Sequence, residues 1–174
     1  MSHTILALSG STRHVSVNKA ILDLIAATYT PTFTIENYDL TRLPFFNPDL
    51  TDDEHLPEPV RDFIAAIEQS NAVLICTPEY VFSLPGIIKN AIEWTVATTA
   101  FQDKPVAMIV ASLSGQKAFE SLDLVMTTVG ASMTPRTRLL ITGAYSKLNK
   151  ATGALDEHTI AQLKDLMQDL TQLL

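Results

Sequence analysis

The stretch AVLICTPEYVFSLPGIIKNAIEW, residues 72–94, decides the fold of this chain. Residues 72–76 form a continuous apolar run, which is typical of a short strand buried on both faces of a sheet. Thr77 and Pro78 end the run, because proline cannot donate a hydrogen bond to a sheet ladder. Pro85 suits the first turn of a helix, and apolar residues recur after it at spacings of three and four. The stretch predicts a strand, a loop and a helix. In open α/β sheets, ligands bind at such loops.

The same order of strand, loop and helix recurs along the rest of the chain. Apolar or alternating runs predict further strands at residues 4–8, 33–38, 105–111 and 139–141. Amphipathic periodicity predicts helices at 17–28, 60–69 and 117–129, and a last one from Leu155 onward with Ile160 and Leu163 inward; Ser16 is expected to be the first N-cap. Residues 40–59 hold four prolines and are expected to be mostly loop. Five alternations predict a parallel sheet with helices on both faces.

Length and composition favour one globular domain over residues 1–174. No apolar run is long enough to span a bilayer, and the first residues lack the basic segment and cleavage pattern of a secretory signal. The net charge of −7 argues against nucleic acid and anionic membranes as partners. Cys76 is the single cysteine and lies inside an apolar strand, so we expect an inert core thiol and a cytoplasmic protein.

The loop after the first strand is the second stretch that carries chemistry. It reads SGSTRHVSVN from Ser9 to Asn18 and joins a strand to a helix. Its hydroxyls, the N–H groups of the helix start and Arg13 are suited to hold a phosphate. It is neither a Walker A motif nor GxGxxG, because only Gly10 is present. Taken alone, the loop fits an ordinary capped turn better; the second motif on the neighbouring strand shifts the balance toward a phosphate site.

Both stretches match one family signature. The matching residues after the third strand are Thr77-Pro78-Glu79-Tyr80, Ser83, Pro85-Gly86, Lys89-Asn90-Ala91 and Trp94, and the first loop matches Gly-Ser-x-Arg-x-x-Ser-x-Asn. In these residues the chain resembles the NAD(P)H-dependent FMN reductase family, which includes quinone, azo-dye and chromate reductases. The resemblance implies a flavodoxin-like fold with strand order 2-1-3-4-5. The family usually carries Asn after the Tyr, whereas this chain has Val81.

The resemblance also implies a set of FMN-binding residues. Ser11, Arg13, Ser16 and Asn18 would bind the phosphate, with Ser9 and Val17 beside them. The isoalloxazine ring would be flanked by Pro78, Glu79, Tyr80, Val81 and Phe82, and its other edge would be approached by Ser112 and Gly115. Glu79 admits a second role as a general base, but hydride transfer to a flavin requires none, so we expect it to anchor its loop.

The leading hypothesis is an FMN-dependent oxidoreductase. NADPH or NADH would reduce the bound FMN, which would pass electrons by a ping-pong mechanism to a small acceptor such as a quinone, an azo compound, free flavin or a metal oxyanion. One alternative is a flavin-binding electron carrier that serves a protein partner, and another is a domain that binds a phosphorylated metabolite without flavin. No metal site is expected, because His3, His14, His55 and His158 have no paired ligand spacing.

Self-association is the last expectation. The predicted helix over residues 86–98 carries apolar residues on more than one face, which exceeds what packing on its own sheet requires. The family resemblance points the same way. We therefore expect a homodimer or a homotetramer.

Overall fold

A five-stranded parallel sheet forms the centre of the protein. The computed structural model describes residues 3–13, 15–30, 32–52, 54–149 and 152–174. The strands stand in the order β2-β1-β3-β4-β5, and they are β1 (His3–Ser9), β2 (Phe33–Tyr38), β3 (Ala72–Thr77), β4 (Val106–Ala111) and β5 (Arg138–Ile141). This order confirms the flavodoxin-like prediction. β3 and β4 are buried at every residue, as continuous apolar strands covered on both faces must be.

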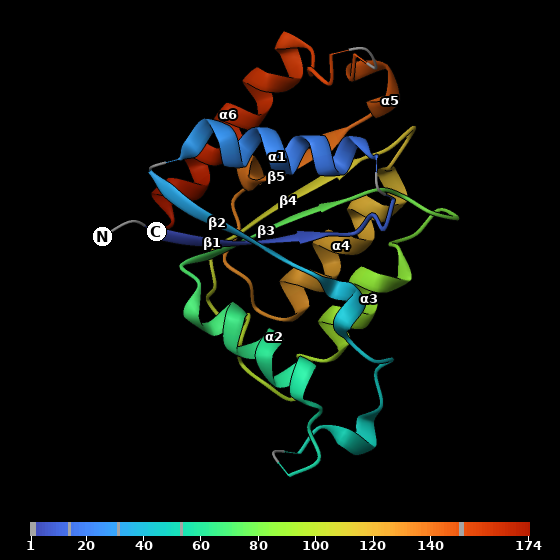
Figure 1. Ribbon diagram of the computed structural model, residues 1–174, viewed down its shortest axis with the longest axis vertical. Helices are drawn as coiled ribbons and strands as arrows, with labels where there is room; N and C mark the ends of the chain where they lie inside the picture. The colour runs from blue at the N-terminus through green and yellow to red at the C-terminus, as the bar shows by residue number, and fades with distance from the viewer. Residues whose placement is uncertain (1–2, 14, 31, 53, 150–151) are drawn as a thin grey trace.

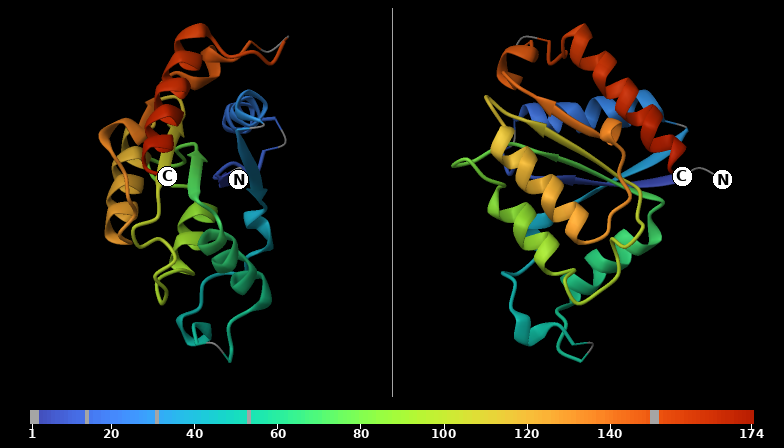
Figure 2. Two further views of the ribbon diagram at one scale, coloured as in Figure 1. Left: turned by 90° about the vertical axis from the view of Figure 1, so that its left-hand side faces the viewer. Right: turned by 180° about the vertical axis from the view of Figure 1, so that it is seen from behind.

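Helices cover both faces of the sheet (Figures 1 and 2). α1 (Val17–Tyr29), α5 (Ala144–Lys147) and α6 (Glu157–Gln172) lie on one face, and α2 (Glu58–Gln69), α3 (Gly86–Glu93) and α4 (Gln116–Thr128) lie on the other. Each layer encloses its own apolar core, one built with Ile21 and Leu166 and the other with Phe63 and Trp94. None of the described helices is long and apolar enough to cross a membrane.

Several elements differ from their sequence-based predictions. Two 3-10 helices, η1 (Leu40–Arg42) and η2 (Pro48–Leu50), interrupt the expected loop, and η3 (Pro135–Thr137) precedes β5. α5 was not predicted, because four residues are too few for a periodic pattern. Ile160 is 39% exposed, so its predicted inward position is wrong; Thr159 beside it takes the buried position in the first turn of α6. α3 ends at Glu93, and the residues after it form turns.

The loops after β1 and β3 meet because these strands are neighbours. The Gly10 N–H donates to the Cys76 carbonyl at 2.9 Å. A Cβ on Gly10 would overlap the Thr77 hydroxyl and lie 2.6 Å from Thr77 Cβ, so only glycine allows this approach. The carboxyl ends of the strands lie toward the right in Figure 1, where the green loop after β3 protrudes. Both chemistry-bearing stretches therefore come to one edge of the sheet, where the strand order reverses.

Candidate functional site

The loop between β1 and α1 is braced by its own hydroxyl groups. Ser9 Oγ donates to the Ser11 carbonyl and accepts from the Ser11 N–H, both at 3.3 Å. The Arg13 N–H donates to Ser11 Oγ at 3.4 Å. These bonds are longer than the usual range of about 2.7–3.2 Å, so a ligand with stronger acceptors can compete for the same groups.

Helix α1 begins with an open first turn. Ser16 is its N-cap, and Ser16 Oγ accepts from the Lys19 N–H at 3.0 Å, as the sequence predicted. The N–H groups of Val17 and Asn18 precede the first intrahelical hydrogen bond, so the helix supplies no acceptor for them. The helix dipole adds partial positive charge at the same place. The start of α1 therefore presents donors to an anion.

The side chains of Val17 and Asn18 are buried rather than free to meet a ligand. Asn18 Nδ2 donates to the Ala111 carbonyl at 3.2 Å, and the Cys76 thiol donates to Asn18 Oδ1 at 3.4 Å. Asn18 thus ties α1 to β3 and β4, and what it offers to the loop is its backbone N–H. Burial raises the pKa of the Cys76 thiol, which keeps the thiol protonated and chemically inert.

Arg13 is exposed and stands between two hollows. A hollow of about 260 Å³ lies toward β2 and is lined by Ser11, Arg13 and Lys19 together with Thr41 and Ile87. A second hollow, of about 420 Å³, lies toward α5 and shares Arg13 and Ser16. Arg13 Nη1 lies 3.5 Å from the hydroxyl of Tyr145, a residue 132 positions away that sequence reasoning missed. No local pattern could have found Tyr145.

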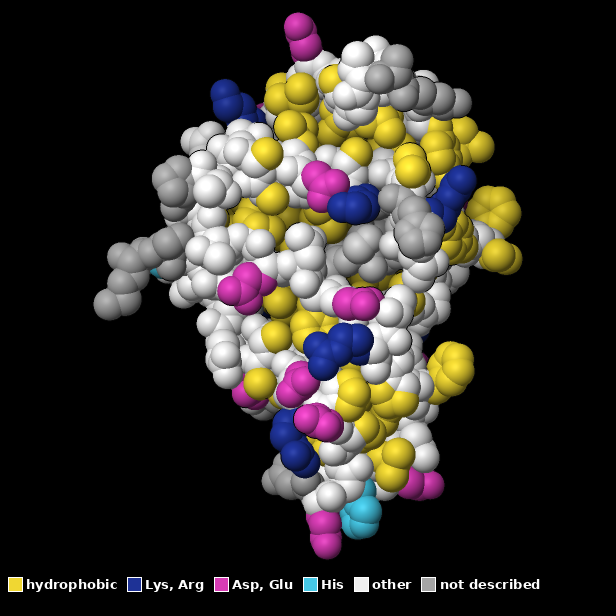
Figure 3. All heavy atoms as spheres, in the orientation of Figure 1, with side chains coloured by type: hydrophobic (Ala, Val, Ile, Leu, Met, Phe, Trp, Pro, Cys, Tyr) yellow, Lys and Arg dark blue, Asp and Glu magenta, His cyan; other side chains and the backbone are white. Residues whose placement is uncertain are grey.

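The loop after β3 carries a two-residue hairpin turn. Tyr80 and Ser83 exchange both backbone hydrogen bonds at 3.0 Å, and Val81 and Phe82 between them have φ values of +52° and +54°. Two central residues with positive φ are typical of a type I′ turn. Val81 is 95% exposed and Phe82 is 77% exposed. Hydrophobic side chains project from the same right-hand edge of the molecule in Figure 3.

Position 81 requires a conformation that valine disfavours. Asn is several-fold enriched at positive φ, whereas a β-branched residue there is an outlier. The residue that the family usually carries suits this turn, and Val81 does not. The turn forms nevertheless, so something other than the preference of Val81 maintains it.

Glu79 is held by the start of α4. Its Oε1 accepts from Ser114 Oγ at 2.9 Å and from the Gly115 N–H at 3.2 Å, and its Oε2 accepts from the N–H groups of Lys117 at 2.9 Å and Ala118 at 3.0 Å. Desolvation raises the pKa of Glu79, but these hydrogen bonds outweigh it and leave the pKa below its usual 4.5. This anchoring agrees with the role expected for Glu79, because a carboxylate with four donors is poorly suited to accept a proton as a base.

The loop after β4 is tied to its neighbours through its backbone. Ser112 is buried, its N–H donates to the Ile141 carbonyl at 3.2 Å, and its carbonyl accepts from the Ala144 N–H at 2.9 Å. Gly115 is the N-cap of α4 with φ +83°, a conformation that favours glycine. Since its N–H already donates to Glu79, this group is not free for a ligand. The loop lies beside the β3 loop, and direct contact of Ser112 and Gly115 with a flavin stays a prediction.

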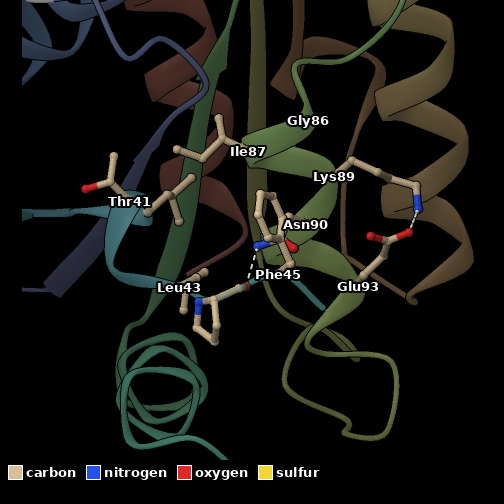
Figure 4. Close-up of a pocket in the computed structure, with 10 residues that line it drawn as sticks. Thr41, Leu43, Phe45, Gly86, Ile87, Lys89, Asn90 and Glu93 are labelled. Carbon is tan, nitrogen blue, oxygen red and sulfur yellow. Dashed lines mark hydrogen bonds and ion pairs between the residues drawn. The ribbon is translucent and has the colours of Figure 1, made fainter. Parts of the chain in front are cut away.

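A larger, mainly apolar hollow of about 720 Å³ lies along α3 (Figure 4). Ile87, Lys89 and Glu93 reach it from α3, and Leu43 and Phe45 reach it from the segment after η1. Asn90 Nδ2 donates to the Pro44 carbonyl at 3.0 Å, which fixes that segment against the helix. This hollow shares Thr41 and Ile87 with the smaller one beside Arg13, so the two adjoin.

The structure brings the sequence-predicted residues to one edge but uses them in different ways. Ser11, Arg13 and Ser16 stand at the open start of α1, and Tyr80, Val81 and Phe82 form the neighbouring turn, whereas Pro78 is buried beneath it. Lys19 and Thr41 join the hollow beside Arg13 without having been predicted. Among the described residues no group of His, Cys, Asp and Glu side chains could hold a metal ion, and His14 lies outside them.

These features define a class of protein. A parallel sheet of order β2-β1-β3-β4-β5 with an anion-suited loop after β1 is a flavodoxin-like fold whose ligand edge lies at the β1 and β3 ends. A flavodoxin from the domain Archaea shares the fold at a TM-score of 0.64 and 13% identity.

Comparison with known proteins identifies the family. The model of the NADPH-dependent FMN reductase family matches residues 3–145, and the chain therefore belongs to that family. The chain is 29% identical over 170 residues to NADH:(hydroxy)cinnamate reductase subunit CrdA of Vibrio ruber, covering 94% of this chain and 83% of that protein. It is 36% identical over 110 residues to NAD(P)H-dependent FMN reductase PA1204 of Pseudomonas aeruginosa, covering 62% of this chain and 59% of that one.

A solved structure agrees with the family assignment. FerB, a flavoenzyme NAD(P)H:(acceptor) oxidoreductase from Paracoccus denitrificans, matches with a TM-score of 0.84 and 28% identity over 98% of this chain and 96% of that one. The predicted class is thus confirmed: the protein is an oxidoreductase of the NADPH-dependent FMN reductase family, with FMN as cofactor and NAD(P)H as electron donor.

The residues at the β1 edge fit FMN chemically. A phosphate monoester requires donors and a cation, and the first turn of α1, Ser11, Ser16 and Arg13 supply both. A flavin ring requires an apolar wall, which Tyr80 and Phe82 can provide.

Proposed function

We propose that this protein binds FMN with its phosphate at the β1–α1 loop and transfers electrons from NAD(P)H to a small flat acceptor. Ser11, Arg13, Ser16 and the N–H groups of Val17 and Asn18 would hold the phosphate. The observation that carries the proposal is the open start of α1 with Arg13 beside it, at the edge where β1 and β3 end. Ser9 would act indirectly by bracing Ser11.

The β3 loop would form the wall of the ring site. Glu79 holds the loop to α4, and Pro78 is buried. The exposed residues Tyr80, Val81 and Phe82 would border the open side of the ring. Bound FMN would supply reversible redox chemistry, accepting a hydride from the nicotinamide and reducing the acceptor. Backbone groups of the β3 loop would orient the ring, and no side-chain base is required.

Ping-pong kinetics follow from a single open side. If the protein covers one face of the ring, the nicotinamide and a flat acceptor compete for the other. The oxidised nucleotide must then leave before the acceptor binds, so NADP or NAD should compete with the acceptor. Steady-state rates measured over a grid of NAD(P)H and quinone concentrations test this. Parallel double-reciprocal lines are expected, and intersecting lines would contradict the mechanism.

The primary experiment is cofactor identification. Protein purified or refolded with excess FMN should show a flavin spectrum and release about one FMN per chain on denaturation, and it should oxidise NADPH or NADH when a quinone is added. Absence of bound flavin would refute the proposal and favour a site for another phosphorylated metabolite. Bound flavin without NAD(P)H oxidation, until a partner reductase is added, would favour an electron carrier.

The acceptor class is the finer part of the proposal. The names of relatives support quinones and flavins, because 2-hydroxy-1,4-benzoquinone reductase of Burkholderia sp is 33% identical over 116 residues, covering 65% of this chain and 62% of that protein. Azo compounds and metal oxyanions are further candidates. The exposed Phe82 ring borders the proposed site, so Phe82→Ala should change the ranking of acceptors by kcat/KM more than it changes FMN affinity. An unchanged ranking would remove Phe82 from the acceptor site.

We also propose self-association through the α3 and α4 surface. Most apolar residues of α3 are buried in their own chain, namely Ile88, Ala91 and Ile92, and so is Trp94 just after the helix, so these residues are not available for self-association. The support comes instead from exposed Phe45, Val96 and Leu124 and from a second apolar hollow of about 470 Å³ between α3 and α4. Sedimentation at micromolar concentration tests the homodimer or homotetramer, and Leu124→Asp should shift the mass toward a monomer.

We also propose a cytoplasmic location and small-molecule partners. A reducing cytoplasm suits a single thiol that stays buried and protonated. The acidic net charge of −7 supports small-molecule partners over nucleic acid or membrane.

A further inference from the structure

The turn at the tip of the β3 loop adopts a conformation that its own residues disfavour. Val81 and Phe82 both have positive φ, and neither is glycine or asparagine. Their side chains are almost wholly exposed, so burial of these side chains does not compensate for the strain. A strained turn of this kind persists only when the surrounding structure fixes it, and here that structure lies at its base.

The base of the turn is fixed to α4 by Glu79. Glu79 immediately precedes the turn, and its two oxygens accept from four donors on residues 114–118. The N-cap of α4 is Gly115, which has no side chain to satisfy the first N–H groups of the helix. A carboxylate from the loop after β3 therefore supplies the cap, and its negative charge is also favoured by the helix dipole.

We infer that Glu79 is a positioning residue: its carboxylate clamps the base of the Tyr80–Ser83 turn to the first turn of α4 and thereby holds Val81 and Phe82 in their left-handed conformations at the ligand edge. On the other side of the turn, Leu84 and Pro85 are buried and lead into α3. The turn is thus held between two helices. That it borders the flavin and the acceptor rests on the proposed function, whereas the clamp itself does not.

Glutamine cannot replace the carboxylate in this clamp. Four donors converge on two oxygens, and an amide has only one oxygen, so its NH₂ group would face two donors. Glu79→Gln keeps the size of the side chain and removes the acceptor. Glu120→Gln is the matched control, because Glu120 is exposed on the same helix and, among the described residues, bonds to side chains alone, those of Gln116 and Lys117.

Amide hydrogen exchange of the protein without cofactor tests the clamp directly. In Glu79→Gln, exchange at Lys117 and Ala118 should accelerate about tenfold or more, the equivalent of losing one charge-assisted hydrogen bond. Exchange at Tyr80 and Ser83 should accelerate with it, because the turn loses its support. Glu120→Gln should match the wild type at all four amides. Unchanged exchange in Glu79→Gln, or acceleration confined to α4, would overturn the inference.

A second substitution tests whether strain is what the clamp opposes. Val81→Asn places a residue that tolerates positive φ in the turn. In the Val81→Asn background, Glu79→Gln should still loosen Lys117 and Ala118 but accelerate exchange at Tyr80 and Ser83 much less, with Phe82 as the one strained residue left in the turn. Equal acceleration at the turn in both backgrounds would show that Glu79 does not hold a strained conformation.

Steady-state kinetics test whether the clamp matters for binding of the acceptor. Glu79→Gln should raise the KM for a quinone about tenfold while changing FMN affinity much less, because the phosphate site lies on the β1 loop. Val81→Asn should restore the KM of Glu79→Gln. A KM that stays at the wild-type value would overturn the role of Glu79 in positioning the acceptor wall. If the wild type binds no FMN, the proposed function fails, and the exchange results still decide whether the clamp exists.

Discussion

Two helix N-termini meet the ligand edge of this protein, and they are used in opposite ways. At α1 the cap is local: Ser16 satisfies the Lys19 N–H, and the first two N–H groups of the helix stay open beside Arg13. At α4 the cap comes from another part of the chain: the carboxylate of Glu79, in the loop after β3, accepts from the N–H groups of Gly115, Lys117 and Ala118. The proposed anion site and the Glu79 clamp thus use the same backbone feature, a helix N-terminus, and the difference is whether the protein supplies its own carboxylate.

The largest effect is expected from a substitution that blocks the close approach of the β1 and β3 loops. Gly10→Ala would place a Cβ 2.6 Å from Thr77 Cβ and against Ile88, and overpacking of this kind costs about 3 kcal/mol of unfolding free energy. Gly86→Ala is the control, because no atom lies within 4 Å of its added Cβ, and stability should hold or rise. Urea denaturation of both variants measures the difference. Equal stability of the two variants would contradict the close approach.

The second-largest effect tests whether Arg13 and the start of α1 bind the phosphate. Arg13→Ala should weaken FMN by about 1.5–3 kcal/mol, the usual strength of a hydrogen bond to a charged group, and should barely affect riboflavin, which lacks the phosphate. Titration by fluorescence quenching gives both affinities. Arg42→Ala serves as the control, because Arg42 is exposed and pairs with Asp62. An equal loss for both ligands would mean that Arg13 does not bind the phosphate.

A smaller effect separates capping from ligand binding. Ser16→Ala should lower the unfolding free energy by about 1 kcal/mol through the lost N-cap and should also weaken FMN. Asp156→Ala removes the N-cap of α6, where Asp156 accepts from the Thr159 N–H at 2.9 Å, so it should cost similar stability without changing FMN affinity. Thermal unfolding and FMN titration of the pair make the comparison. If both variants bind FMN equally, Ser16 is only a cap.

The smallest effect is the pH dependence of the stability that the Glu79 clamp contributes. The pKa of Glu79 is lowered in the folded protein, so its carboxylate contributes stability above its unfolded-state pKa and loses that contribution as pH falls through the folded-state value. The stability difference between wild type and Glu79→Gln should be constant from neutral pH to about 5 and should shrink below about 4. Urea denaturation across this range measures it. A difference that grows on acidification would have the wrong sign.

Sequence reasoning succeeded where the deciding pattern was local. The buried strands β3 and β4, the N-cap Ser16 and the position of the loop between β1 and α1 agree with their predictions. The family signature then selected the strand order, which periodicity alone could not do. Prediction failed for α5, because a four-residue helix has no period, and for Ile160, because Thr159 rather than Ile160 faces the core in the first turn of α6.

The chemistry of the open helix start was determined by the sequence, whereas the use of each neighbouring side chain was decided by the tertiary structure. The Ser-rich loop, Arg13 and the capped helix stand within ten consecutive residues, so their proximity is a property of the chain. Glu79 finds its donors 35 to 39 residues away, Asn18 bonds to Ala111 93 residues away, and Arg13 meets Tyr145 132 residues away. These partners are set by which strands become neighbours and by how the side chains pack between them. Short-range propensity carries no information about either, so the same Glu79 could not be assigned to a helix cap until the sheet had brought β3 and β4 together.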